Sequence, residues 1–142
     1  MPTSGAGNRE IGGRWNSPGS FPVIYTALSE ITARAELLRL AARAAIDIRG
    51  FLPRRLYTLR VELAGVLDIQ APEALAALGL TFADVAADDP SACQAVGDAA
   101  HKLTLEAILA PSASSRGPIL AIFELNLRPD SAIQVERYAT WN

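Results

Sequence analysis

Hydrophobic residues first gather in "PVIYTA", residues 22–27, after a segment (1–20) rich in Gly, Pro, Ser and Asn. The apolar, β-branched and aromatic run predicts a short buried strand, and the preceding composition predicts a loop. Ser29 then offers a side-chain oxygen that suits a helix N-cap, and Glu30 suits the first helical turn. We therefore expect a strand followed directly by a helix.

The pattern that follows is helical. Apolar residues at helical spacing define one face, made of Ile31, Ala35, Leu38, Ala42 and Ile46. This spacing predicts a long amphipathic helix from Glu30 to about Arg49, with its apolar face turned to the core. Arg39 and Arg43 fall on another face. A glycine and a proline soon after Arg49 are typical of a helix end.

The middle of the chain mixes short strands and helices. Residues 56–63, "LYTLRVEL", alternate and predict a half-buried strand whose apolar face carries Tyr57, Leu59, Val61 and Leu63. "VLDI", 66–69, predicts a short strand. Three further segments have helical patterns: 71–80, 81–86 and 89–103. Gly97 weakens the last of these by roughly 1 kcal/mol relative to alanine.

The C-terminal third changes to strand periodicity. Three apolar segments are separated by "SSRG" and "RPD" turns, namely 105–113, 118–127 and 131–141. The order is a strand, a long helix, a strand, small helices and then several strands. This order predicts an α+β single domain with a mixed or largely antiparallel sheet, one long helix and smaller helices.

Composition and charge agree with a globular domain. The chain has 142 residues, half of them apolar and a fifth charged, and its net charge is −2. A chain of this length buries a core without disulfides or metal. The acidic balance lacks the cationic footprint of a nucleic-acid binder, so we expect no direct contact with nucleic acid.

Cysteine and histidine usage narrows the setting further. Cys93 is the only cysteine, which excludes an internal disulfide and suits a reducing cytosol. With His101 as the only histidine, we expect no zinc site and no metal. No apolar run reaches the ~18 residues of a membrane span, and no signal peptide is visible. These features predict a cytoplasmic protein.

Several familiar motifs are missing. The sequence has neither GxxxxGK[ST] nor a GxGxxG after a strand, and its lone histidine offers no Ser–His pair. Asp88 and Asp89 precede Pro90 and are best interpreted as a helix start.

Four side chains stand out, and each has an ordinary structural alternative. Arg14, in "GGRWN", presents a planar donor fork for phosphate or carboxylate, or else pairs with a carboxylate while Trp15 fills the core. Glu36 flanks the apolar face of the helix and faces either a cleft or solvent. Ser112 ends an apolar strand as a site residue or a turn former. Tyr25 serves either a site or the core.

The stretches "GGRWNSPGSFPVIYTALSE", "ARAELLRL" and "AILAPSA" together resemble the RES domain family, which is named for a shared arginine, glutamate and serine. The matching residues are Arg14, Glu36 and Ser112. Tyr25 lies midway between the first two, 11 residues from each. The resemblance extends over most of the chain, although its middle matches only in outline.

This resemblance implies a fold like that of the diphtheria-toxin-like ADP-ribosyltransferases. It also implies a toxin of a type II toxin–antitoxin pair, whose Xre-like antitoxin blocks the pocket. RES proteins consume NAD by breaking its nicotinamide–ribose bond, with inorganic phosphate or water as acceptor, or in some cases by transferring ADP-ribose to a protein. NAD would thus be a substrate.

The resemblance also implies site roles. Glu36 would hold the ribose hydroxyls and stabilise an oxocarbenium-like centre. Arg14 would bind the pyrophosphate or the phosphate acceptor, and Tyr25 would stack against the nicotinamide or its ribose. Ser112 would bond to the nicotinamide-ribose end or position Glu36. The pocket wall would include Trp15 and Asn16.

Family members usually begin with a further strand that carries an arginine followed by an aromatic residue. No such strand is recognisable before "SGAG", so we expect residues 1–142 to form a RES domain without it. Three functions stay open: an NAD-depleting toxin that inhibits growth, a protein ADP-ribosyltransferase toxin, and a catalytically impaired module that binds the antitoxin. An oligomeric toxin–antitoxin assembly is compatible with each.

Overall fold

The computed structural model describes residues 4–5 and 9–142, and the predicted N-terminal loop lies partly outside them. It confirms the α+β class. The strands are β1 (Val23–Ala27), β2 (Arg54–Glu62), β3 (Val66–Asp68), β4 (Ala107–Pro111), β5 (Pro118–Phe123) and β6 (Ala132–Trp141). The helices are α2 (Glu30–Arg43), α3 (Pro72–Ala77), α4 (Phe82–Ala86) and α5 (Ser91–Lys102), with 3₁₀ turns at Ile48–Gly50 and Glu124–Asn126.

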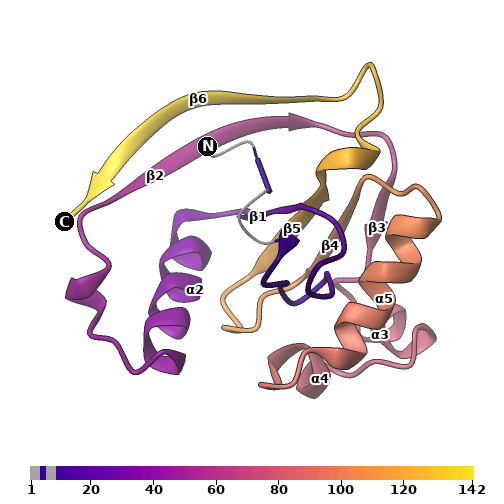
Figure 1. Cartoon of the computed structure of the whole chain (residues 1–142), viewed down its shortest axis with the longest axis horizontal. Coiled ribbons are helices and arrows are strands. Elements are labelled where there is room, and N and C mark those ends of the chain that lie inside the picture. Colours follow the sequence, from indigo (N-terminus) through magenta and orange to yellow (C-terminus); the bar gives the residue numbers. More distant parts are fainter. Residues whose placement is uncertain (1–3, 6–8) are drawn as a thin grey trace.

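The strands form two sheets rather than one. The first has the order β1-β5-β4-β3, with β4 parallel to β3 and antiparallel to β5. β1 pairs antiparallel with β5, from Val23 opposite Phe123 to Ala27 opposite Ile119. β2 and β6 pair with each other as an antiparallel ribbon that arches over this sheet (Figure 1). The mixed sheet predicted from the sequence is therefore present, with a separate ribbon above it.

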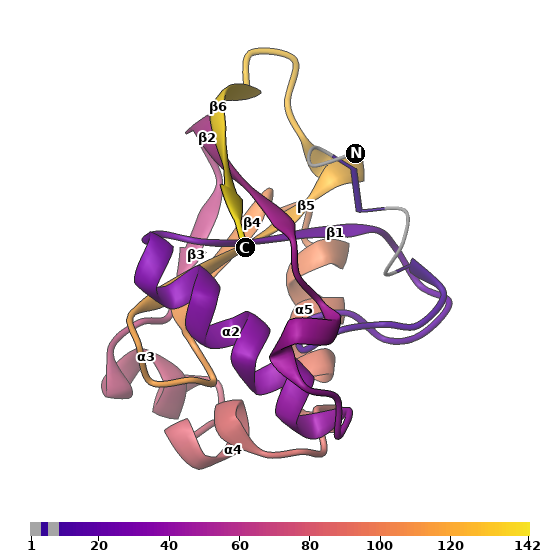
Figure 2. The same cartoon turned by 90° about the vertical axis from the view of Figure 1, so that its left-hand side faces the viewer.

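Both faces of the four-stranded sheet are covered. One face carries Ile108, Ala121 and Phe123 and packs with buried residues of α3, α4 and α5. The other carries Ala107, Leu120 and Ile122 and packs against apolar side chains of the ribbon and its connections. Two views at right angles show the ribbon and helices α3 to α5 on opposite sides of the sheet (Figures 1 and 2). This layering explains the near-continuous apolar runs in β4 and β5.

The long helix differs from its prediction in extent and orientation. α2 ends at Arg43 rather than near Arg49, and Ala45 then takes a positive φ of 54°. The predicted apolar face is largely exposed, with Ile31 at 70% and Leu38 at 48% of full exposure. The buried positions include Thr32 instead, whose hydroxyl donates to the Arg116 carbonyl. This contact turns the polar side of α2 inward.

The apolar face predicted for residues 56–63 is correct only in part. Leu59 and Val61 are half-buried, but Tyr57 is exposed and stacks obliquely on Tyr138 of β6. Val61 and Leu63, further along the chain, pack against the core cluster of the sheet, whereas Tyr57 contacts the ribbon itself. The register with β6 shifts between Thr58 and Leu59, but the extra residue, Glu136, lies in β6, so β2 keeps its alternation.

A buried carboxylate fixes the base of the ribbon. Glu106 is fully buried just before β4, and its Oε1 accepts bonds from the amides of Ala64 (2.8 Å) and Gly65 (2.9 Å). Its Oε2 accepts from the Arg128 amide at 3.0 Å. Burial raises the pKa of Glu106, but the hydrogen bonds from Ser131 and these amides outweigh it and lower the pKa to about 2. The charged carboxylate therefore ties one end of the ribbon, where β2 ends and β6 begins, to the sheet.

No helix in the described ranges combines the length and hydrophobicity that a bilayer crossing requires. The longest of them, α2, has 14 residues.

Candidate active site

The "GGRWN" stretch is a tight turn, and its glycines have specific reasons. The Gly13 amide donates to the Asn16 carbonyl at 3.0 Å, and Gly12 has a φ of +80°. A Cβ on Gly13 would lie 2.6 Å from the Tyr25 hydroxyl oxygen. Any other residue there would push the Tyr25 ring away, so the glycine allows the turn and the ring to pack together.

The hydroxyl of Tyr25 joins this turn to β1. It donates to Asn16 Oδ1 at 2.6 Å and accepts from the Trp15 amide at 2.8 Å. Burial raises the pKa of Tyr25 well above its usual value, so the hydroxyl stays protonated and can donate. Asn16 is fully buried, and its Nδ2 donates to the Phe21 carbonyl at 3.0 Å. The network holds the Arg14 backbone in one position.

Helix α5 supports the turn from behind. A Cβ on Gly97 would lie only 1.8 Å from the Trp15 carbonyl oxygen. Gln94 Nε2 donates to the Gly13 carbonyl at 2.9 Å. The glycine that weakens the helical pattern therefore lets the turn contact the helix backbone. Trp15 itself is fully buried in the core.

Glu36 and Ser112, far apart in sequence, meet directly. Ser112 follows β4 and is fully buried, and its Oγ donates to Glu36 Oε1. The Ser114 amide donates to the same Oγ at 3.1 Å. Glu36 is half-buried in the middle of α2. One carboxylate oxygen is thereby fixed, and the side chain is oriented.

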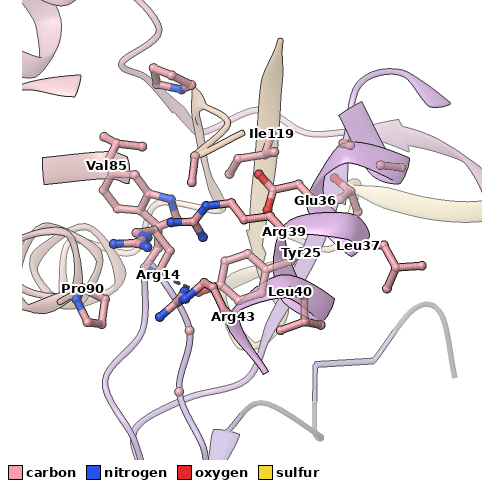
Figure 3. A pocket seen from close by; sticks show the side chains of 18 of the residues that line it. Arg14, Tyr25, Glu36, Leu37, Arg39, Leu40, Arg43, Val85, Pro90 and Ile119 are labelled. Atoms are coloured by element: carbon pink, nitrogen blue, oxygen red, sulfur yellow. Dashed lines mark hydrogen bonds between the residues drawn. The ribbon is translucent and has the colours of Figure 1, made fainter. Parts of the chain in front are cut away.

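These residues surround one cavity of about 860 Å³. Arg14, Tyr25 and Glu36 line it, and Trp15 borders it. Figure 3 shows Glu36 projecting from α2 on one side and Arg14 on the other. Ser112 reaches the cavity through Glu36, and Asn16 lies behind Tyr25. The structure thus brings the guanidinium of Arg14, the ring of Tyr25 and the carboxylate of Glu36 together around one cavity.

Arg14 is held in an unusual environment. Its Nη1 is buried and has no hydrogen-bond partner in the described part of the chain. Burial lowers the pKa of Arg14, Cys93 opposes this shift, and Arg39 and Arg43 add to it. A buried guanidinium nitrogen without a partner is costly, and an anion in the cavity would satisfy it. The carboxylate partner that was the structural alternative for Arg14 is not present among the described residues.

Sequence reasoning missed further residues of the cavity. Arg39 and Arg43, assigned only to another face of the helix, point into it (Figure 3). Cys93 does not line the cavity but is buried beside Arg14, and burial raises the pKa of its thiol. The i, i+4 spacing of the two arginines is the signal that was available. Their partners, the carbonyls of Ala86 at the end of α4 and of Asp88 just after it, are more than 40 residues away and could not be read from the pattern.

Comparison with known proteins identifies the family. The model of the RES domain matches residues 1–141, and the chain belongs to that family. Its relatives include the NAD(+) phosphorylase MbcT of Mycobacterium tuberculosis (strain H37Rv) and of Mycobacterium bovis. Each is 41% identical over 128 residues, covering 89% of this chain and 69% of the relative.

A solved structure gives the same result for the fold. The crystal structure of the M. tuberculosis MbcT–MbcA toxin–antitoxin complex matches with a TM-score of 0.88 and 38% identity. The match covers 97% of this chain and 76% of that one.

Proposed function

We propose that this protein consumes NAD by phosphorolysis, breaking the bond between nicotinamide and ribose and passing ADP-ribose to inorganic phosphate. The observation that carries the proposal is the cavity itself. A buried guanidinium nitrogen of Arg14 without a partner faces a carboxylate, Glu36, that Ser112 holds in place. The relatives at 41% identity are named NAD(+) phosphorylases.

The proposed reaction balances as follows. The bond between ribose C1′ and the nicotinamide nitrogen breaks, and its electron pair neutralises the positive ring, so nicotinamide leaves uncharged. A phosphate oxygen then bonds to C1′, and the phosphate gives up a proton to solvent. The transition state carries positive charge on the ribose, as in glycoside hydrolysis. Catalysis requires a negative group near that centre.

Glu36 is the group suited to this task. A carboxylate fixed before the reaction stabilises developing positive charge without reorganising. Ser112 has no exposed surface and acts through Glu36, so we assign it a positioning role.

Arg14 and Tyr25 bind and orient the substrate in this proposal. The Arg14 fork suits a phosphate group of NAD. Tyr25 is more than a third exposed despite its bonded hydroxyl, so its ring offers a face for the nicotinamide-ribose end. Trp15 and Asn16 hold the wall that carries Arg14.

The biological setting is proposed from the same relationship. We infer that residues 1–142 form one RES domain, which acts in the cytoplasm as the toxin of a toxin–antitoxin pair. An Xre-like antitoxin would bind it and block the cavity, and an oligomeric assembly would be compatible with this. The related MbcT has been solved in complex with an antitoxin.

The decisive experiment measures nicotinamide release from NAD by the purified chain while phosphate is varied. We expect the rate to saturate with phosphate and the product to be phosphorylated ADP-ribose. Glu36→Gln should lower kcat by about 10²-fold or more. Glu30→Gln is the matched control, since Glu30 lies on the same helix but is exposed and paired with Arg34.

Other outcomes separate the alternatives. A labelled protein band from labelled NAD and host lysate would replace this proposal with protein ADP-ribosylation. Binding of the antitoxin without any NAD turnover would leave an inactive binding module. In cells, expression without the antitoxin should stop growth and lower NAD, and Arg14→Ala should relieve both.

A further inference from the structure

The cavity carries more positive charge than one substrate phosphate group requires. Arg14, Arg39 and Arg43 all line it, and Glu36 is the only acidic residue among its described lining residues. Figure 3 shows Arg39 and Arg43 extending from α2 towards the wall that carries Arg14. Such a cluster is electrostatically unfavourable unless anions occupy it.

The two α2 arginines extend from their helix to the opposite wall. Arg39 Nη2 donates to the Ala86 carbonyl at 2.9 Å, and Arg43 Nη2 donates to the Asp88 carbonyl at 3.3 Å. Backbone carbonyls take one N–H from each fork and fix its position. A guanidinium has five N–H donors, so each arginine retains donors for a ligand.

Their charge is only weakly compensated. Asp88 lies 3.6 Å from Arg43 Nε, but its side chain is 90% exposed. A pair of this kind is screened by water and contributes little. Arg39 and Arg43 also depress the pKa of Arg14, which shows that the three charges act on one another. The cavity therefore presents more positive charge than its one described carboxylate balances.

We propose that Arg39 and Arg43 form a second phosphate site, separate from Arg14, which binds the free phosphate acceptor and selects it over water. The inference rests on the proposed function and names how its second substrate is held. Glu36, Arg39 and Arg43 follow one another along one side of α2, with Arg39 about 4.5 Å and Arg43 about 10 Å along the axis from Glu36. A phosphate on the pair would occupy the same cavity as the ribose that Glu36 contacts.

Charge balance favours the free phosphate over the NAD pyrophosphate as its occupant. NAD brings a doubly negative pyrophosphate and a positive ring, and Arg14 on the facing wall is available for it. Phosphorolysis must place an additional, nearly dianionic phosphate in the same cavity, whereas hydrolysis would not. The surplus cations on α2 match that additional anion.

The kinetic test compares Arg39→Gln, Arg43→Gln and the double variant with wild type. We expect the KM for phosphate to rise about tenfold or more, since a charge-assisted fork is lost. The KM for NAD should change less than twofold, and the share of free ADP-ribose among the products should increase. Lysine at both positions should recover part of the phosphate affinity, because it keeps the charge without the fork.

Arg49→Gln is the control. Arg49 is exposed, pairs with Asp47 and lies outside the cavity, so its replacement should leave both KM values unchanged. An increased KM for NAD with an unchanged KM for phosphate would overturn the inference and assign the pair to the pyrophosphate. Unchanged values for both substrates would overturn it as well.

A binding measurement separates this inference from the proposed function. Inorganic phosphate should raise the Tm of the wild-type chain relative to chloride at equal ionic strength, and much less that of the double variant. Equal shifts in both proteins would overturn the second site even if the enzyme is an active phosphorylase. No nicotinamide release from wild type, together with a phosphate shift lost in the double variant, would refute the reaction and keep the site.

Discussion

Replacing Glu106 by glutamine tests how the ribbon is anchored. The substitution keeps the shape of the side chain but removes its charge and turns one acceptor oxygen into a donor amide. Three backbone amides, those of Ala64, Gly65 and Arg128, donate to the carboxylate. In glutamine only one of the two side-chain end atoms is an oxygen that can accept, so at least one of these buried amide donors loses its partner.

The magnitude follows from the pKa. Glu106 has a pKa of about 2 in the folded chain against 4.5 for the free group. Each pKa unit corresponds to about 1.4 kcal/mol, so the charged carboxylate contributes about 3 kcal/mol to the free energy of unfolding at pH 7. A lowered pKa means that this contribution is complete above the unfolded pKa and is lost as pH falls from about 4.5 towards 2. About 1 kcal/mol should remain at pH 3.

The assay is urea unfolding of wild type and Glu106→Gln at pH 7 and pH 3. We expect the wild-type protein to be more stable by about 3 kcal/mol at pH 7 and by about 1 kcal/mol at pH 3. Glu73→Gln, which replaces an exposed carboxylate in α3, should change the free energy of unfolding by a few tenths of a kcal/mol at most. A difference that is equally large at both pH values would refute the electrostatic reasoning, because it would trace the loss to packing.

Three further variants test the site. Gly97→Ala should lower the free energy of unfolding, measured in denaturant, by about 1–3 kcal/mol and should lower NAD turnover, because the new Cβ would meet the Trp15 carbonyl. Ala99→Gly, on the exposed side of the same helix, should cost only about 1 kcal/mol and keep activity. A Gly97→Ala protein that is more stable and fully active would contradict the contact. Tyr25→Phe should lower the free energy of unfolding by about 1–3 kcal/mol and raise the KM for NAD, because the Trp15 amide loses its acceptor. An unchanged stability and KM would refute the role of the hydroxyl in holding the turn. Ser112→Ala should reduce kcat about ten- to a hundredfold with little change in KM, and Ser112→Thr should restore part of it; a change confined to KM would argue against positioning.

The fold was largely predictable because its signals are local. The strands after residue 104 follow from apolar runs between turns, and the small helices follow from helical patterns; the structure contains each of them, although the strand predicted over 118–127 ends at Phe123. The orientation of α2 was wrong, because periodicity finds an apolar stripe but not what it packs against. Ile31 and Leu38 face outward since Thr32 is drawn to the Arg116 carbonyl, a contact that spans 84 residues.

In the candidate site, too, local signals could be read from the sequence and long-range contacts could not. Arg14, Tyr25 and Glu36 were proposed from a resemblance, and the structure places them around one cavity, although their catalytic roles stay predictions. Arg39 was missed because its partner, Ala86, is 47 residues away. Gly97 was interpreted as a weakness of its helix, because a one-dimensional pattern does not show a second backbone in contact.

The position of β1 has a consequence for how the protein is made on the ribosome. β1 carries Tyr25 at the sheet edge, and among the described strands it pairs only with β5, which spans residues 118–123. Ser112, which orients Glu36, is likewise synthesised long after Arg14, Tyr25 and Glu36. An unfinished chain therefore contains Arg14, Tyr25 and Glu36 but no sheet to hold them together. The cavity can form only after β5 has been synthesised, so products truncated before residue 118 should be harmless to the cell that makes them.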